Sequence, residues 1–272
     1  RIQQLFHALP QIPTATELPV PTGKLDVEGM VIVPPGSGRP SVKGVSFSVE
    51  AGEAIAVIGA SGSGKSSLAR AMAGVWPLVQ GNIRLDSADY QQWDPHRLGK
   101  HIGYLPQSVE LFAGTIAQNI ARLAKVDDKA VIAAAKAAGA HDLILRLPKG
   151  YDTPIGEGGA MLSGGTRQRV ALARALYGDP RIIILDEPNA SLDDEGDRAL
   201  HRAIGEMKKA GRTVVIVTHK PQMLQMVDKI LVMSFGLTLA FGPRDAVLQK
   251  LRAPHLSVAA SNEKPRPHVV AG

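Results

Sequence analysis

Cysteine is absent from the 272 residues of the chain, which excludes disulfide bonds and thiolate metal sites and fits a reducing compartment. No apolar run approaches the roughly 20 residues that a membrane-spanning helix requires. The eight histidines are scattered along the sequence, so no metal cluster is predicted. A secretory signal is also missing, and because the chain begins at Arg1 without methionine, we expect it to be a piece of a longer protein.

Hydrophobic residues make up 44% of the chain, and its formal net charge is +6. This hydrophobic content is enough for a full α/β core, in one large domain or two small ones. A positive charge fits a nucleic acid or a membrane surface as partner. Here the basic residues are dispersed, which favours an ordinary solvated surface instead.

Strand-type and helical patterns alternate along most of the chain, which predicts an α/β fold with a mixed, largely parallel sheet. We expect strands at 25 to 33 and 45 to 58, joined by the turn PPGSGRP as an antiparallel β region, and at 181 to 186, 213 to 218 and 229 to 234. An alanine-rich helical pattern from about 108 to 148, broken at Gly139, predicts an inserted helical subdomain that extends to about residue 178.

Both ends of the chain differ in composition from the middle. Residues 1 to 24 lead into a Pro/Thr-rich run, which is typical of a linker. The stretch 253 to 272 is polar and contains proline, and we expect it to be disordered. The predicted domain therefore covers residues 25 to 252.

The stretch GASGSGKSS, residues 59 to 67, lies between the apolar run EAIAVI and the helix-like LARAMAG. Its spacing fits the P-loop, in which backbone N–H groups and a helix N-terminus hold phosphates, a lysine reaches the β- and γ-phosphates and a hydroxyl binds Mg²⁺. A flexible Gly/Ser loop is the alternative, but a strand and a helix flank this one. The expected nucleotide-binding residues are Gly59, Ala60, Ser61, Gly62, Ser63, Gly64, Lys65, Ser66 and Ser67.

Two later strands also end in polar side chains that suit phosphate chemistry. RIIILDEP places Asp186 and Glu187 at a strand end, where Asp186 can serve Mg²⁺ and Glu187 can polarise a water for attack on the γ-phosphate. The alternative is an acidic pair that faces solvent. His219 follows a further apolar strand. A lone histidine is usually structural, but this position favours contact with the γ-phosphate.

The stretch LSGGTRQRVALARAL, residues 162 to 176, predicts a second anion site. Ser163 can cap the helix that follows, while Gly164 and Gly165 let a phosphate approach bare N–H groups. One triphosphate does not need two such sites from one chain, so we expect this one to complete the P-loop site of a partner subunit. An ordinary capped helix with a basic face is the alternative.

Over about residues 25 to 250 the sequence resembles the nucleotide-binding domain of ABC transporters, which implies a P-loop NTPase (RecA-like) core that hydrolyses ATP with Mg²⁺. GASGSGKSS resembles the Walker A motif, IIILDE the Walker B motif, LSGGTRQ the signature and ASLD, with Asp193, the D-loop. His219 resembles the switch histidine, and Gln107 in YLPQ resembles the Q-loop glutamine. The resemblance implies that Glu187, His219 and Gln107 are catalytic, that Asp193 contacts nucleotide, and that Ser66, Gln107 and Asp186 hold Mg²⁺.

Further motifs narrow the resemblance to exporters. TPIGEGG, residues 153 to 159, resembles the X-loop, and LRLPKGYDTPIGEGG and LDEPNASLDDEG resemble type I protein-secretion ATPases of the protease-exporter subgroup. This resemblance implies an upstream transmembrane domain and a second identical chain in a head-to-tail ATP sandwich. It also implies a periplasmic adaptor, an outer-membrane channel and a place at the cytoplasmic face of the inner membrane.

Three other functions compete with polypeptide export. A soluble ABC-type ATPase that acts on nucleic acid would fit the basic charge, but the chain has neither long coiled coils nor a second cassette, so we expect no nucleic-acid partner. A lipid or drug exporter domain shares most of these motifs. A scaffold without activity is disfavoured by intact Asp186, Glu187 and His219.

Two positions depart from the family pattern. Thr166 stands where the signature usually has glutamine, and because threonine keeps a hydroxyl, we expect tuned rather than lost activity. Pro34 stands where an aromatic residue usually stacks on adenine.

Without that ring at position 34, nucleotide binding is expected to be weak, with little preference between ATP and GTP, because base stacking contributes roughly 1–3 kcal/mol. Competition between ATP and GTP for binding to the purified chain measures the preference between the two nucleotides. A clear preference for ATP would contradict the expectation.

Overall fold

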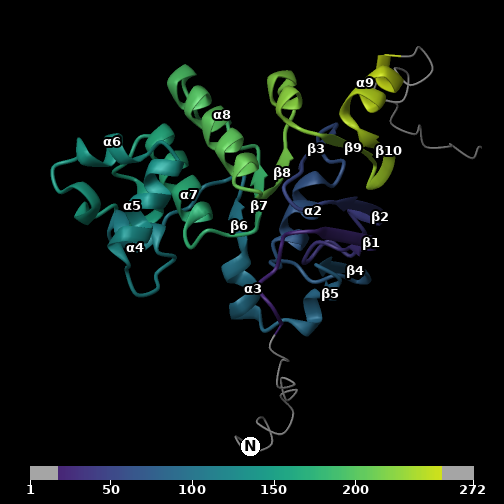
Figure 1. The fold of residues 1–272 in the computed structure, drawn as a ribbon, viewed down its shortest axis with the longest axis horizontal. Helices are drawn as coiled ribbons and strands as arrows, with labels where there is room; N and C mark the ends of the chain where they lie inside the picture. Colours follow the sequence, from purple (N-terminus) through teal and green to yellow (C-terminus); the bar gives the residue numbers. More distant parts are fainter. Residues whose placement is uncertain (1–17, 253–272) are drawn as a thin grey trace, which may run out of the picture.

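The computed structural model describes residues 18–252. The first 17 residues of the predicted linker and the predicted tail at 253–272 lie outside the described residues. Figure 1 shows a central sheet, a helical subdomain at one side and a second, smaller sheet at the other.

Ten strands and eight α-helices are named in the described range. The strands are β1 (Leu25–Ile32), β2 (Val42–Val49), β3 (Ala54–Gly59), β4 (Gln80–Leu85), β5 (Ala88–Asp89), β6 (Ile102–Leu105), β7 (Ile182–Asp186), β8 (Thr213–Val217), β9 (Lys229–Ser234) and β10 (Leu237–Pro243). The helices are α2 (Lys65–Met72), α3 (Pro95–His101), α4 (Ile116–Ile120), α5 (Asp128–Ala137), α6 (His141–Leu145), α7 (Gly164–Leu176), α8 (Asp194–Lys209) and α9 (Arg244–Arg252). Short 3₁₀ turns are η1 (Tyr90–Gln92), η2 (Gly150–Asp152), η3 (Glu157–Gly159) and η4 (Pro221–Met226).

The larger sheet has the strand order β10-β9-β3-β8-β7-β6. Neighbouring strands from β9 to β6 are parallel, and only β10 pairs in the antiparallel sense. Every residue of β7 and of β8 is buried, as expected for continuous apolar runs covered on both faces. The predicted α/β fold with a mixed, largely parallel sheet is confirmed.

Alternate residues of these strands enter two separate cores, because successive side chains of a strand point to opposite faces. In β7, Ile183 and Leu185 belong to the core under the helical subdomain and α8. Ile182 and Ile184 belong to the core that contains α2 and the smaller sheet. Helix α2, which follows the P-loop, is therefore held between the two sheets.

The smaller sheet is antiparallel, with the order β2-β1-β4-β5. Strands β1 and β2 form the expected hairpin, but the single strand predicted at 45 to 58 is wrong. The chain turns at residues 50–53, where Glu53 N–H donates to the Glu50 carbonyl at 3.1 Å, and Gly52 takes a φ of +81°. Strand β2 thus belongs to the smaller sheet and β3 to the larger, because the polar turn lets the chain cross between them.

Helices α4 to α7 form the helical region at the left of Figure 1. The predicted break at Gly139 is confirmed, since α5 ends at Ala137 and Gly139 adopts a φ of +64° before α6 begins. Arg122 fastens this region to the core. Its guanidinium donates to the carbonyls of Arg174 and Ala175 at 3.1 Å, at the end of α7, and to Gly99 O of α3 at 2.7 Å.

The residues just before β1 are tied to the domain. Asp86 accepts hydrogen bonds from the N–H groups of Thr22, Gly23 and Lys24, so the described end of the predicted linker lies against the β4–β5 turn. The boundary at residue 24 stays a prediction. Within residues 18–252, no helix combines the length and the apolar character needed to cross a bilayer.

Candidate functional site

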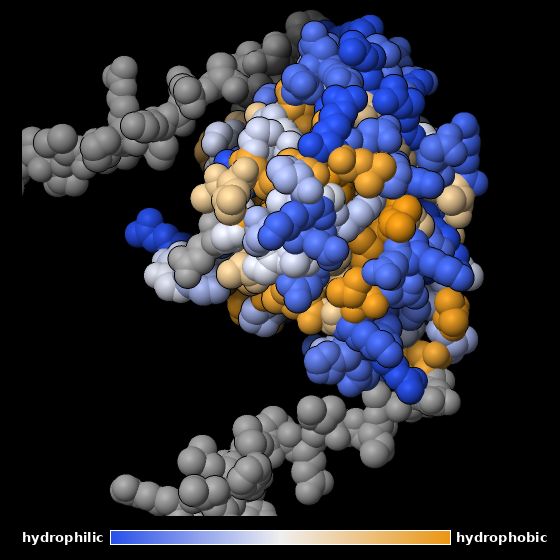
Figure 2. All heavy atoms as spheres, turned by 90° about the vertical axis from the view of Figure 1, so that its left-hand side faces the viewer, coloured by the Kyte–Doolittle hydropathy of each residue, from blue (hydrophilic) through white to orange (hydrophobic). Residues whose placement is uncertain are grey.

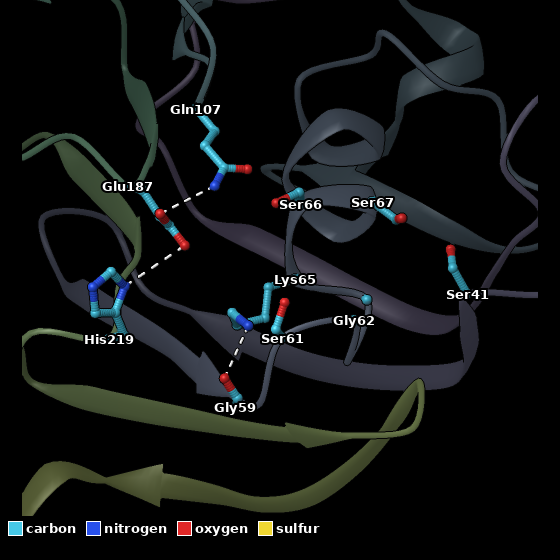
Figure 3. Close-up of a pocket in the computed structure, with 11 residues that line it drawn as sticks. Ser41, Gly59, Ser61, Gly62, Lys65, Ser66, Ser67, Gln107, Glu187 and His219 are labelled. Atoms are coloured by element: carbon cyan, nitrogen blue, oxygen red, sulfur yellow. Dashed lines mark hydrogen bonds and ion pairs between the residues drawn. The ribbon is translucent and has the colours of Figure 1, made fainter. Parts of the chain in front are cut away.

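A cleft of about 430 Å³ opens at the carboxyl edge of the larger sheet. Four parallel strands lead to most of its lining residues, since β3 leads into the P-loop, Gln107 follows β6, Glu187 follows β7 and His219 follows β8. Ser41 alone comes from beside β2 of the smaller sheet. Figure 3 shows them converging on one space. The cleft is lined by Ser41, Gly59, Ser61, Gly62, Gly64, Lys65, Ser66, Ser67, Gln107, Glu187 and His219.

The P-loop backbone requires glycine at two points. Gly64 lies directly before α2 with a φ of +98°, and a Cβ there would collide with the carbonyl oxygen of Ser41. A Cβ on Gly59 would collide with the carbonyl oxygen of Met233 on the neighbouring strand β9. Close backbone packing at both ends of the loop holds its N–H groups and the N-terminus of α2 at the cleft, where they favour an anion.

Lys65 folds back onto this loop. Its Nζ donates to the carbonyls of Gly59 at 2.9 Å and Ala60 at 2.8 Å, and lies 3.5 Å from the hydroxyl of the buried Ser63. Burial lowers the pKa of Lys65, while the nearby carboxylates of Glu187 and Asp186 act in the opposite direction. A phosphate placed in the cleft would exchange these carbonyl contacts for a charge-assisted bond to the ammonium group.

Asp186 is fully buried at the end of β7. The Ser66 hydroxyl donates to its Oδ1 at 3.3 Å, but its Oδ2 is buried without a hydrogen-bond partner. Burial raises the pKa of Asp186, and the Glu187 carboxylate adds to the rise. A buried carboxylate oxygen without a partner is costly. Because a hydroxyl and a carboxylate are hard oxygen ligands, Ser66 and Asp186 fit Mg²⁺.

Glu187 lies at the opposite end of the cleft from Ser41 (Figure 3). Its carboxylate accepts a hydrogen bond from Gln107 Nε2 at 3.1 Å and lies 3.7 Å from His219 Nδ1. The Glu187 backbone adopts a φ of +49°, an unusual conformation for a residue other than glycine. Its N–H continues the ladder of β7 by donating to Val217 O at 2.9 Å, which fixes where the side chain leaves the strand.

The structure does not bring the signature or the D-loop residue into this cleft. Ser163 caps α7 as predicted, because its side chain accepts a hydrogen bond from Thr166 N–H at 3.2 Å, and Gly164 and Gly165 open the helix behind it. Asp193 caps α8 by accepting from Gly196 N–H at 2.8 Å. None of these four residues lines the cleft that holds the P-loop.

Comparison with known proteins identifies the family of the chain. A family profile described as "ABC transporter" matches residues 42–190. The chain belongs to the ABC transporter family. It is an ATP-binding domain of the kind that hydrolyses ATP, and the resemblance deduced from its motifs is confirmed.

Several relatives of this ABC domain are exporters. It is 54% identical, over 93% of its length, to "Type I secretion system ATP-binding protein PrsD" of Rhizobium meliloti, and covers 44% of that protein. It is 41% identical, over 78% of its length, to the "ATP-dependent lipid A-core flippase" of Saccharophagus degradans, and covers 36% of it. The solved structure of a bacterial Atm1-family ABC exporter with ATP bound matches 92% of the chain with a TM-score of 0.80 and 32% identity, and the chain covers 45% of it. The chain thus spans less than half the length of these proteins.

Two residues near the P-loop cleft or its base were given no role by the sequence. Ser41 reaches the cleft from the start of β2, through packing between the two sheets. Gln168 is buried in α7, where its Nε2 donates to the carbonyl of Pro188, directly after Glu187, at 2.9 Å. Gln168 is the last residue of the LSGGTRQ motif, which did not indicate a contact with the turn after Glu187. No motif indicated Ser41.

Replacing Gly64 with alanine tests the close approach of the P-loop to Ser41. The added Cβ must push the loop away from the Ser41 carbonyl, and overpacking of this kind costs about 1–3 kcal/mol. We expect Mg-ATP affinity, measured by calorimetry, to fall about tenfold. Gly74→Ala is the matched control, since Gly74 has a φ of +72° but nothing within 4 Å of its added Cβ. Equal losses of affinity in both variants would contradict this account.

Proposed function

We propose that this domain powers the export of a polypeptide by an ABC exporter of the type I secretion class. The observation that supports the proposal is that the predicted phosphate-binding residues of one chain lie in two separate places. One chain presents a P-loop cleft with Glu187 and His219, and presents Ser163, Gly164 and Gly165 elsewhere. Two chains arranged head to tail would each complete the cleft of the other. The 54% identity to a type I secretion ATP-binding protein supports the choice of substrate class.

In this sandwich, the P-loop amides and Lys65 hold the phosphates from one side, and the capped N-terminus of the partner's signature helix approaches from the other. Mg²⁺ held by Ser66 and Asp186, with Gln107 alongside, would neutralise charge on the phosphate oxygens. Closure of the two chains excludes water, which strengthens each charge contact.

Glu187 acts as the base that polarises the attacking water, and its carboxylate is already oriented by two side chains. Gln107 donates to one carboxylate oxygen and His219 faces the other. The hydrogen bond from Gln168 to the Pro188 carbonyl holds the turn that carries this base. His219 is then placed to contact the γ-phosphate, and hydrolysis removes the contact that keeps the two chains closed.

The partners follow from the same proposal. An upstream transmembrane domain would contact the helical side of the molecule, where exposed apolar side chains occur. Figure 2 views this side and shows apolar residues interspersed among polar ones. The large exposed apolar residues of this region are Phe112, Leu123, Leu145 and Met161. A periplasmic adaptor and an outer-membrane channel would complete the pathway, with this domain at the cytoplasmic face of the inner membrane and without nucleic acid as a partner.

Lipid export is the second candidate, because the domain is 41% identical to a lipid A-core flippase. The higher identity to the secretion protein, over a larger share of the chain, favours polypeptide export.

The mass of the Glu187→Gln variant in solution tests the shared site. Without the base, bound ATP should persist, so light scattering with Mg-ATP should show twice the monomer mass. Adding Ser163→Arg should prevent the dimer, because it places a bulky side chain at the cap of α7. A monomer at saturating Mg-ATP would contradict the shared site in this chain.

A domain exchange tests the substrate class. This chain replaces the matching part of the Rhizobium meliloti secretion protein in one chimera and that of the Saccharophagus degradans flippase in another. We expect the first to restore polypeptide secretion and its Glu187→Gln form to restore none. Lipid export would be favoured instead if the second chimera restored lipid transport while the first hydrolysed ATP but secreted no polypeptide.

A further inference from the structure

The turn between β9 and β10 borders the nucleotide cleft. Phe235 and Gly236 form this two-residue turn, and both have positive φ, +48° and +85°. Gly236 N–H donates to Ser63 O of the P-loop at 3.1 Å, and Gly236 O accepts from Lys43 N–H of β2 at 2.8 Å. A Cβ on Gly236 would come within 2.7 Å of the Ser41 carbonyl oxygen. The turn is therefore fixed against both the P-loop and Ser41.

Phe235 is an unfavourable residue for this position. Turns with two positive φ values prefer Asn, Asp or Gly at the first position, and a bulky residue there is strained. Burial of the ring does not offset the strain, because Phe235 is 73% exposed. Strained residues cluster at active sites, ligand sites and switch regions, so an exposed aromatic ring at this position fits a contact with a ligand.

The neighbouring end of the cleft lacks a surface for a base. If the γ-phosphate lies beside Glu187 and His219, the sugar and base extend toward Ser41, at the opposite end in Figure 3. No aromatic side chain other than the His219 imidazole, at the hydrolytic end, is found among the cleft-lining residues. Neither Pro34 nor Phe235 lines the cleft itself, but Phe235 adjoins Gly236, which packs against the cleft-lining Ser41. The β9–β10 connection passes below Gly62 and Ser41 in the same view.

We propose that Phe235 supplies the aromatic face on which the base of the nucleotide stacks. The inference rests on the proposed function of the cleft and adds a specificity residue to it. Gly236 anchors the turn at Ser41, so the adjoining Phe235, which is 73% exposed, lies next to a residue of that end of the cleft. The ring would replace the stacking that Pro34 does not supply and so raise the affinity above that expected from the sequence alone. Because a phenyl ring accepts any purine, little preference between ATP and GTP is still expected.

The Phe235→Gly variant tests the contribution of the base to nucleotide binding separately from that of the phosphates. Glycine removes the ring and suits the φ of +48°, so the turn is expected to fold. Calorimetry with Mg-ATP and with Mg-tripolyphosphate, which has no base, measures the two parts. We expect the variant to lose about fivefold or more in affinity for Mg-ATP, at the low end of base–aromatic stacking, and to keep its affinity for Mg-tripolyphosphate.

Leu237→Ala is the matched control, because Leu237 is 52% exposed in the strand that follows the same turn, and we expect both affinities to stay unchanged. Phe235→Trp should bind Mg-ATP with quenched tryptophan fluorescence that Mg-tripolyphosphate does not produce. Equal losses for both ligands in Phe235→Gly, or no loss for either, would overturn the proposal. An unaltered chain that binds neither ligand would instead overturn the proposed function of the cleft.

Discussion

The buried carboxylate of Asp186 is the constraint on which the rest of the site depends. It ends a strand whose residues are all buried, and one of its oxygens has no hydrogen-bond partner in the described structure. An unpaired charge in such surroundings is unfavourable unless a cation accompanies it. Because Ser66 bonds to the other oxygen, the first turn of α2 is held against β7. The phosphate-binding loop and the acidic strand end are therefore positioned by the same group that we propose to hold Mg²⁺.

Helix α7 links the two halves of the sandwich that we propose. Its N-terminus carries Ser163, while Gln168, little more than one turn further on, holds the carbonyl that follows Glu187. The adjacent Arg169 is buried and lies 3.4 Å from Asp193 at the cap of α8. A phosphate bound at the signature of one chain would thus act on the turn that carries the base in that same chain. Helix α7, through its contacts with the turn after Glu187 and with the cap of α8, would then couple the two ATP sites.

The sequence predicted those parts of the site that depend on local chemistry. The spacing of glycines, Lys65 and Ser66 identifies the P-loop, and Ser163 was recognised as a helix cap because both patterns involve neighbouring residues. The parallel strands β7, β8 and β9 were recognised by their apolar runs, and the first two place Asp186, Glu187 and His219 at one edge, but the four-residue strand β6 that leads to Gln107 was not predicted. The roles of these side chains in catalysis and in binding Mg²⁺ stay predictions, as does contact of Asp193 with nucleotide.

What the sequence could not predict depends on packing between distant segments. The run from 45 to 58 reads as one strand because a short polar turn hardly interrupts its apolar pattern, yet β2 and β3 belong to different sheets. Ser41 reaches the cleft only because those sheets meet at the P-loop, where its carbonyl excludes any side chain on Gly64. No spacing rule relates residue 41 to residue 64 or to residue 236.

Backbone strain occurs at both ends of the cleft. Glu187 adopts a φ of +49° at the hydrolytic end, and Phe235 adopts +48° in the turn beside Ser41. A left-handed residue other than glycine costs roughly 1–2 kcal/mol, and hydrogen bonds of neighbouring backbone groups hold each of the two in place. From this conformation the Glu187 carboxylate contacts Gln107 and faces His219. Phe235 has a similar conformation beside the opposite end of the cleft, where we propose that its ring binds the base.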